Sequence, residues 1–357
     1  MPFVLECDSG TGTLRQRRND EVERALERAY SFGSLITGTM DDTGIGRRYA
    51  EDFLRFFLDS VGSDLRGKRI LEVGCGTGYF LSLLQERGAD VLGVEPGPQG
   101  QRGGEKYGVP IVRNFFPCEE VRGGFDVVVA YAVLEHMTAP EVFLKATGGF
   151  LNEGGCLLLA VPDCEPYLGQ GDISCLLHEH WSYFAKKTLA RELERGGYRA
   201  SRIEQAGFGG SLYCRALPKG DASAPVKYDE TEAKTLDAVR ARFLENLARM
   251  ERLFLEMGVA GNEGHTLGIY VPGRMINTLS VAEIPKRLCL RFFDDNPLLE
   301  NKYYPSFPQK IENFDDLLRC PPDSVFVASR TFGKTIEERI GSHSEKVRLI
   351  GWDEVFS

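Results

Sequence analysis

Short apolar runs alternate with amphipathic stretches through the first half of the chain. Five runs have the length and composition of buried strands, at residues 69–73, 91–94, 111–112, 126–131 and 156–161. A helix is predicted ahead of the first strand, because apolar side chains recur at helical spacing over residues 46–61. Strands that alternate with helices predict an α/β fold with a doubly wound parallel sheet. Two later runs, at 198–205 and 211–216, predict a hairpin that closes this sheet.

A second alternation follows a polar stretch at residues 218–225 that has the composition of a linker. Asp229 and Glu232 resemble a capping box, and apolar residues then recur every three or four positions to residue 257, which predicts a long amphipathic helix. The pattern divides the chain into an N-terminal helical segment, a large α/β domain, a linker helix and a smaller Rossmann-like α/β domain. Their expected bounds are 1–45, 46–220, 221–258 and 259–357.

Composition and charge narrow the class of protein. Of 357 residues, 42% are hydrophobic and 27% are charged, and the net charge is −9 without any basic run. The net negative charge disfavours nucleic acid as the main partner. Neither a signal-peptide pattern nor a long apolar span occurs, so we expect a cytoplasmic protein with no membrane partner. The nine cysteines are scattered and form no C-x-x-C pair, which predicts buried thiols instead of disulfides or zinc ligands.

A glycine turn directly follows the first predicted strand. Gly74, Gly76 and Gly78 occupy alternate positions after Glu72, in the order E-V-G-C-G-T-G. Glycine at these positions lets the backbone turn tightly and approach a ligand. Glu95 ends the next apolar strand, where a carboxylate can accept hydrogen bonds from both hydroxyls of a ribose. The spacing differs from the dinucleotide fingerprint G-x-G-x-x-G, and the turn together with Glu95 predicts a nucleoside-bearing ligand.

Three of the five histidines are informative by position: two lie where an acceptor site would open, and the third follows the fourth predicted strand. His178 and His180 flank Glu179 after the fifth strand, at the edge where open α/β sheets bind ligands. A neutral imidazole beside a carboxylate can take a proton from an acceptor. His136 follows Glu135 at the end of the fourth strand. The alternatives are the polar start of a surface helix and a metal site, but H-x-H alone supplies two ligands, so no metal is expected.

The glycine turn resembles the first motif of the class I S-adenosylmethionine-dependent methyltransferases. In that family the loop passes close to the methionine part of the cofactor. An acidic strand end and a later strand that finishes in V-L-E-H-M follow in the family's order. The resemblance implies S-adenosyl-L-methionine as the cofactor. The residues expected to bind it are Glu72, Gly74, Cys75, Gly76, Gly78, Tyr79, Glu95, Pro96 and Ala130.

Further segments resemble the sugar C-methyltransferases, which methylate 3-position carbons of nucleotide-linked deoxy-keto sugars. In order, they are L-E-V-G-C-G-T-G-Y-F, V-L-E-H-M, H-E-H-W-S-Y-F, G-G-S-L-Y-C and F-D-D-N-P-L-L-E-N-K-Y-Y-P-S-F-P-Q-K-I. The resemblance implies that His180 is the base that removes the proton beside the ketone, that Glu179 orients it and that His136 lies near the ketone. The enolate carbon then attacks the methyl group.

The same resemblance implies that the C-terminal unit encloses the acceptor, a small-molecule sugar nucleotide, and contacts its nucleotide. Candidate acceptor-binding residues are His178, Arg274 and Asn277. Arg274 ends a strand-to-helix turn, V-P-G-R, that lies where a phosphate-binding turn would lie. This turn is a weak signal, because it has one glycine and its proline lacks an N–H donor.

The chain also departs from the sugar C-methyltransferase pattern. Leu177 stands where that family has a tyrosine, and Met275 and Ile276 replace a lysine and a glycine. Only Cys7 occurs in the first 74 residues, too few for the family's N-terminal zinc domain. The alternatives are therefore an O- or N-methyltransferase of another small metabolite, a non-catalytic cofactor-binding subunit and, disfavoured by the glycine spacing, a nicotinamide oxidoreductase. The helix over 229–257 is a candidate spacer between domains, core helix or oligomer contact.

Overall fold

The computed structural model describes residues 3–33, 40–219, 234–260, 264–273, 275–344 and 347–356. The chain divides into two compact units. Unit 1 comprises Met1–Glu165 and Leu177–Ala233, and unit 2 comprises Pro166–Leu176 and Lys234–Ser357. This division differs from the expected one in two places, because residues 166–176 group with unit 2 and the long helix belongs to unit 2 instead of forming a separate linker.

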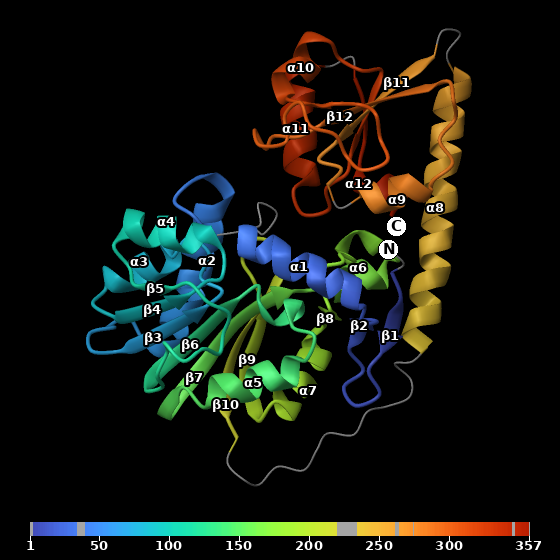
Figure 1. The fold of residues 1–357 in the computed structure, drawn as a ribbon. Helices are drawn as coiled ribbons and strands as arrows, with labels where there is room; N and C mark the ends of the chain where they lie inside the picture. The colour runs from blue at the N-terminus through green and yellow to red at the C-terminus, as the bar shows by residue number, and fades with distance from the viewer. Residues whose placement is uncertain are drawn as a thin grey trace. The chain divides into compact units, whose positions relative to one another are not determined.

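A seven-stranded sheet forms the centre of unit 1 (Figure 1), in the order β5-β4-β3-β6-β7-β10-β9. Its strands are β3 (Arg69–Val73), β4 (Asp90–Val94), β5 (Ile111–Val112), β6 (Phe125–Tyr131), β7 (Leu151–Pro162), β9 (Tyr198–Gln205) and β10 (Ser211–Pro218). Strands β3 to β7 run parallel, and β10 is antiparallel to β7 and β9. The doubly wound sheet and its closing hairpin are thus confirmed, and the strand order reverses between β3 and β6.

Helices cover both faces of this sheet. They are α2 (Gly44–Val61), α3 (Tyr79–Gln85), α4 (Pro98–Tyr107), α5 (Pro140–Gly148) and α7 (Lys186–Arg195). Phe53 and Phe57 of α2 pack with Phe80 of α3 in one buried cluster, whereas Phe143 of α5 and Leu189 of α7 belong to the cluster on the other face. Burial of each such side chain contributes roughly 1.5–3 kcal/mol relative to exposure.

The N-terminal segment corrects the expectation of a helical segment over 1–45. It begins with β1 (Leu5–Cys7) and β2 (Leu14–Gln16), and α1 (Asp20–Phe32) comes only after them. Strand β1 pairs with β2, and β2 pairs with β8 (Ser182–Tyr183), in a three-stranded sheet. The Asp8 side chain holds the hairpin turn by accepting hydrogen bonds at 2.9 Å from the backbone N–H groups of Gly10 and Thr11. Strands of three residues are too short for periodicity to reveal.

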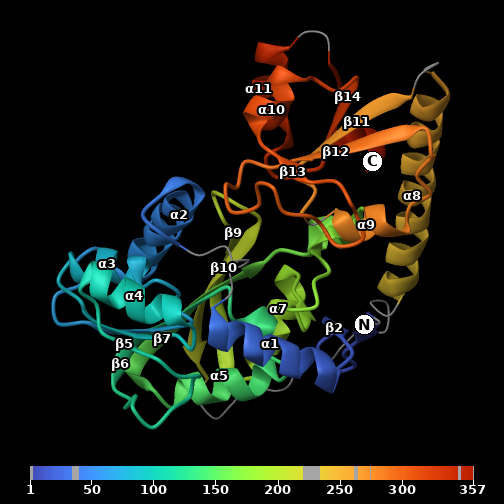
Figure 2. The same ribbon diagram turned by 45° about the horizontal axis from the view of Figure 1, so that its top comes forward.

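Unit 2 has a five-stranded parallel sheet in the order β13-β12-β11-β14-β15. Its strands are β11 (His265–Tyr270), β12 (Leu288–Phe293), β13 (Ile311–Glu312), β14 (Ser324–Val327) and β15 (Arg348–Ile350). Its helices are α6 (Glu165–Gly169, which begins one residue before the unit), α8 (Lys234–Ala260), α9 (Ile276–Val281), α10 (Phe314–Arg319), α11 (Gly333–His343) and α12 (Trp352–Val355). Figure 2 shows α10 and α11 side by side, and side chains of both join one buried cluster.

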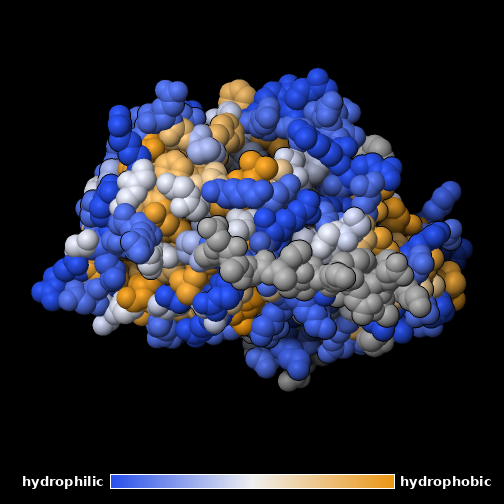
Figure 3. Space-filling model, turned by 90° about the horizontal axis from the view of Figure 1, so that it is seen from below, coloured by the Kyte–Doolittle hydropathy of each residue, from blue (hydrophilic) through white to orange (hydrophobic). Residues whose placement is uncertain are grey.

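Helix α8 is a core helix of unit 2. Met250, Phe254 and Met257 are buried in the cluster that also contains Leu267 of β11 and Phe292 of β12. The predicted capping box, Asp229 with Glu232, and most of the predicted linker at 218–225 lie outside the described residues. Among the described helices, none is long and apolar enough to cross a membrane. Apolar and polar side chains are interspersed on the face that Figure 3 displays.

Candidate cofactor and acceptor site

A cavity of about 220 Å³ lies in unit 1 at the carboxyl ends of β3, β4 and β6. This is the point at which the strand order reverses, where open α/β sheets bind ligands. Residues predicted to bind the cofactor that line this cavity are Glu72, Gly74, Cys75, Gly76, Glu95 and Pro96. Gly78, Tyr79 and Ala130 lie outside the lining. Gly78 precedes α3, the Tyr79 ring packs against Tyr107, and Ala130 is buried in the sheet core.

Backbone hydrogen bonds fix the glycine turn beside the cavity. The N–H groups of Gly74 and Cys75 both donate to the carbonyl of Val94, at 2.8 and 3.2 Å. Gly74 has φ +69°, and a Cβ atom there would lie 2.6 Å from the Cγ2 atom of Val133. A residue with a side chain would therefore strain the backbone and collide with the wall of the cavity.

Glu95 joins the glycine turn to the segment that follows β4. Its Oε2 accepts a hydrogen bond from the Gly76 N–H at 3.0 Å, and its Oε1 accepts from the Gly97 N–H at 2.8 Å and from Gln99 Nε2 at 2.9 Å. Burial raises the pKa of Glu95, and the two backbone hydrogen bonds oppose that rise. The carboxylate is thus held at the cavity edge, and its oxygens offer further lone pairs to a ligand hydroxyl.

Glu72 presents a buried carboxyl to the same cavity. The residue is 1% exposed, and its Oε2 has no hydrogen-bond partner in the described part of the chain. Burial raises the pKa of Glu72 well above its usual range, and the charge of Glu95 adds to the rise. An unpartnered buried carboxyl is unfavourable, so a ligand ammonium is the kind of group that this position can accept. The site therefore fits a cofactor that carries both a ribose and an amino group.

The rest of the cavity wall was missed by sequence reasoning. It is mostly apolar and aromatic: Tyr30, Met40, Val73, Val94, Gln99, Asn114, Phe115, Phe116, Tyr131, Ala132, Val133, Met137 and Phe143, besides His136. Asn114 and Phe115 follow β5 at the same sheet edge, so the rule that ligands bind at the carboxyl ends of parallel strands could have found them. Tyr30 and Met40 come from the N-terminal segment, and no motif marks them.

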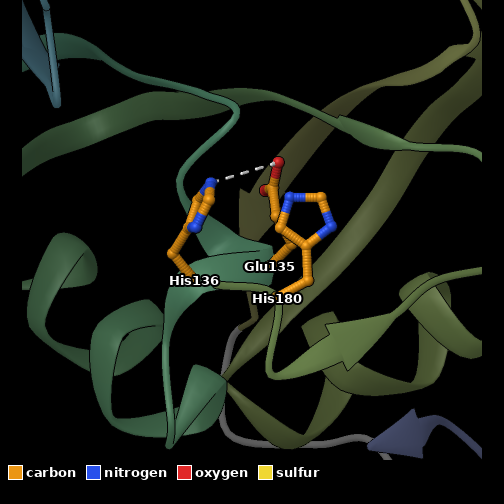
Figure 4. Close-up of side chains that lie close together, drawn as sticks. All are labelled: Glu135, His136 and His180. Carbon is orange, nitrogen blue, oxygen red and sulfur yellow. Dashed lines mark ion pairs between the residues drawn. The ribbon is translucent and has the colours of Figure 1, made fainter. Parts of the chain in front are cut away.

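A cluster of Glu135, His136 and His180 lies beside the cavity (Figure 4). Glu135 and His136 form a short turn after β6, η1 (Leu134–His136), and the Trp181 N–H donates to the Glu135 carbonyl at 2.7 Å. This hydrogen bond brings the predicted H-E-H segment to the end of β6. The rings of His136 and His180 meet edge to face with centroids 4.8 Å apart. The structure thus brings together two of the predicted catalytic residues.

The hydrogen bonds of His136 define its tautomer. Its Nδ1 lies 2.9 Å from the carbonyl oxygen of Glu179 and 3.0 Å from the hydroxyl of Tyr30. A carbonyl oxygen only accepts, so we assign the proton to Nδ1 and the lone pair to Nε2. That Nε2 lies 3.9 Å from Oε1 of Glu135.

Burial sets the charge of this cluster. It lowers the pKa of His136 to about 4, against the opposing effect of the hydrogen bond to the Glu179 backbone. It raises the pKa of Glu135 to about 8, an increase that a backbone hydrogen bond opposes and the charge of Glu179 reinforces. Burial likewise raises the pKa of Tyr30, and the charges of Glu179 and Glu135 add to this rise. Near neutral pH, therefore, the His136 ring is uncharged and Glu135 is mostly protonated.

The H-E-H segment is a turn and not the start of a helix. The His180 N–H donates to the Leu177 carbonyl at 3.0 Å, and the Tyr183 hydroxyl contacts the carbonyls of Leu177 and His180 at 2.9 Å each. His180 is buried in the turn, whereas the His178 ring packs edge-on against Phe3 at 5.3 Å. The backbone carbonyl of Glu179 contacts the His136 ring.

The remaining predicted acceptor residues belong to unit 2. Asn277 lies in α9, and its amide contacts the carbonyl of Leu176 at 3.5 Å. Arg274 lies outside the described residues. The acceptor roles of Arg274, Asn277 and His178 stay predictions.

Most residues that line the cavity lie in a stretch that matches a known protein family. Residues 43–202 match the model of a family described as a methyltransferase domain. The match covers less than half of the chain, and it makes this part of the chain similar to a methyltransferase domain. The sheet order is that of the class I methyltransferase fold, and the glycine turn and Glu95 line the cavity of this domain.

Curated proteins match part of the chain. The ubiquinone biosynthesis O-methyltransferase of Azorhizobium caulinodans is 34% identical over 103 residues, which cover 27% of this chain and 41% of that protein. The protein of the same name from Bordetella avium is 26% identical over 118 residues, which cover 31% and 49%. The chain thus spans about half or less of the length of these relatives.

Solved structures resemble the fold at low identity. A 1,6-didemethyltoxoflavin-N1-methyltransferase from Burkholderia thailandensis is 16% identical, with a TM-score of 0.42, and the match covers 58% of this chain and 96% of that one. A putative S-adenosylmethionine-dependent methyltransferase from Listeria monocytogenes is 12% identical, with a TM-score of 0.41 and coverage of 48% and 99%.

Proposed function

We propose that the protein is an enzyme that transfers a methyl group from S-adenosylmethionine to a small acceptor. One observation carries the proposal. The cavity of the methyltransferase domain is lined by the glycine turn, Glu95 and His136, and the His136 ring contacts the buried ring of His180. A cofactor site and a pair of imidazoles therefore lie side by side, as a proton-coupled methyl transfer requires.

The residues present fit the cofactor. Glu95 would hold the ribose hydroxyls, and Glu72 would receive the amino group of the methionine part, where the cationic partner lets its buried carboxyl ionise. The Gly74 to Gly78 turn gives the backbone close access to the same part. The bound cofactor supplies an electrophilic methyl group on a sulfonium, which leaves as a neutral thioether.

The acceptor loses a proton to His180 in this proposal. Its electron pair then forms the new bond to the methyl carbon while the carbon–sulfur bond breaks. His136 stays uncharged beside the reacting atoms, because burial lowers its pKa to about 4. Glu179 positions the imidazoles, in part through its carbonyl contact with His136. Positioned general-base catalysis contributes roughly 10²–10⁴-fold in rate.

For the acceptor we favour a nucleotide-linked sugar methylated at carbon. The support is the order of the H-E-H, G-G-S-L and F-D-D-N segments, which resembles the sugar C-methyltransferases. A second candidate is O-methylation of another small metabolite, because the relatives named above are O-methyltransferases. The same base serves both reactions, since a hydroxyl and a carbon beside a ketone each lose a proton.

Two measurements test the proposal. Calorimetry should show that the purified chain binds S-adenosylmethionine and its demethylated product, S-adenosylhomocysteine. Mass spectrometry of a panel of keto-sugar nucleotides and small phenols should then find a product that has gained one CH₂ group, and NMR identifies the methylated atom. Absence of affinity for both cofactor forms would overturn the proposal. Binding without turnover on any acceptor would favour a cofactor-binding subunit.

A further inference from the structure

We propose that Glu135, His136 and His180 form a binding site for a divalent transition cation of the Zn²⁺ and Co²⁺ class. Each of these residues offers one ligand atom, and the three atoms lie within 4.8 Å of one another. It is the one such group of histidine, cysteine and acidic side chains found among the described residues. Figure 4 shows the carboxyl of Glu135 between the two imidazole rings.

His136 already has the arrangement of a metal ligand. Its Nδ1 proton points to the Glu179 carbonyl at 2.9 Å, which leaves the lone pair of Nε2 facing the cluster. Metal-binding histidines characteristically donate their other ring N–H to a carbonyl or carboxylate, which fixes the tautomer and the orientation of the ring. The ring is also held by the Tyr30 hydroxyl at 3.0 Å.

The carboxyl of Glu135 gives a second, independent indication. Its side chain is 1% exposed, and its Oε2 has no hydrogen-bond partner in the described part of the chain. Its Oε1 faces the His136 lone pair across 3.9 Å, which is too long for a hydrogen bond. Two ligand atoms that are each about 2.0–2.2 Å from one ion can lie up to roughly 4 Å apart. A cation between them would satisfy both groups, and a small shift of His180 would complete the site.

The donor set indicates the class of cation. Two imidazoles and one carboxylate suit zinc, cobalt, manganese or ferrous iron, whereas Ca²⁺ and Mg²⁺ prefer oxygen ligands. Three protein ligands leave at least one position open. From the sequence alone no metal is expected, because H-x-H offers two ligands. In the structure His178 of that motif turns to Phe3, and the other two ligands come from the end of β6.

A bound cation would inhibit methyl transfer, a consequence that rests on the proposed function. A neutral imidazole has one lone pair, and coordination by His180 uses it. The same ring then cannot take a proton from the acceptor. The cation site itself does not depend on the proposed function, so the two can fail separately.

Cobalt binding tests the site without any acceptor. The tag-free, EDTA-treated chain is titrated with Co²⁺, and the visible absorption of the coordinated ion is recorded together with calorimetry. We expect one Co²⁺ per chain, which Zn²⁺ displaces. Glu135→Gln and His180→Gln should each weaken binding by at least about 100-fold, since even outer partners of metal ligands are worth about 10–100-fold. His178→Gln should bind Co²⁺ like the wild type, because its ring lies outside the cluster.

Circular dichroism melting of each variant confirms that it is folded before its Co²⁺ affinity is compared. No Co²⁺ binding by the wild type, which is the expected result if Glu135 simply holds a proton, would overturn the site. Unweakened binding by Glu135→Gln would overturn it as well. Once an acceptor is known, Zn²⁺ should lower turnover and EDTA should restore it. Unchanged turnover with the site filled would overturn the inhibition alone.

Discussion

His178 and His180 lie in one turn, yet their rings meet different neighbours. The His180 ring contacts His136 beside the cavity, whereas the His178 ring contacts Phe3. His180→Ala should therefore lower kcat by about 10²–10⁴-fold, because the general base is lost. The affinity for S-adenosylhomocysteine should be retained, because the cofactor site is unchanged. His178→Ala should raise KM at nearly constant kcat, as its predicted role in acceptor binding requires. Steady-state kinetics separates these outcomes, and an equal loss of kcat in both variants would indicate damage to the turn instead of loss of a base.

The buried carboxyl of Glu135 predicts a pH dependence of stability. Its pKa rises from an ordinary value of 4.5 to about 8 on folding, so between these values the folded state holds a proton that the unfolded state has lost. Stability must then fall as pH rises through this window, by an amount on the order of a few kcal/mol. The opposite holds for His136, whose pKa falls from 6.5 to about 4, so its contribution rises with pH between those values.

Glu135→Gln isolates the first effect, because the amide resembles the protonated acid and does not titrate. Urea unfolding of the metal-free chain should show little difference between variant and wild type at pH 5. At pH 8 the variant should be the more stable of the two. Parallel stability profiles across this range would show that Glu135 does not take up a proton on folding.

The glycine turn that joins β3 to α3 predicts a loss of cofactor affinity on substitution. Gly74→Ala should weaken S-adenosylhomocysteine binding. The added Cβ atom would lie 2.6 Å from Cγ2 of Val133 in the cavity wall, and φ at this position is +69°. Gly154 offers a matched control, since its φ is +77° but no atom lies within 4 Å of its Cβ position. Both alanine variants should lose about 1–2 kcal/mol of stability from backbone strain. Calorimetry should find reduced cofactor affinity in the Gly74 variant alone, and equal affinities would place the turn outside the cofactor site.

Elements differ in how well the sequence predicts them. Strands β3 and β6 are buried on both faces and read as continuous apolar runs, so their positions and order follow from the sequence. The three-residue strands β1 and β2 carry no such signal, and the pairing of β2 with β8 depends on contacts between residues far apart in the chain. Glu135 and His180 also come together through a contact between distant residues, because the Trp181 N–H donates to the Glu135 carbonyl. No local pattern encodes this hydrogen bond. Motifs therefore pointed to part of the residues around the cavity, and the fold determined which of them meet.

For the whole molecule, the sequence predicts two α/β units and leaves the place of the helix between them open. An amphipathic helix after a polar stretch suits a spacer, a core helix or an oligomer contact equally well, because periodicity reports an apolar stripe and not its partner. The structure assigns α8 to the core of unit 2 through its buried methionines and Phe254. The same helix exposes Leu244, Leu255 and Val259, and its role as an oligomer contact stays a prediction.

Two adjacent residues of α8 test this assignment. Phe254 is 2% exposed in the core of unit 2, whereas Leu255 is 57% exposed. Phe254→Ala should destabilise the protein by about 3–5 kcal/mol, since it leaves a cavity among packed side chains. Leu255→Ala should change stability by less than about 0.5 kcal/mol, as for other surface substitutions. Urea unfolding of both variants measures the difference. Equal, small losses of stability in both variants would mean that α8 is a solvated spacer. A much larger loss in the Phe254 variant requires that one face of α8 is packed against the sheet of unit 2.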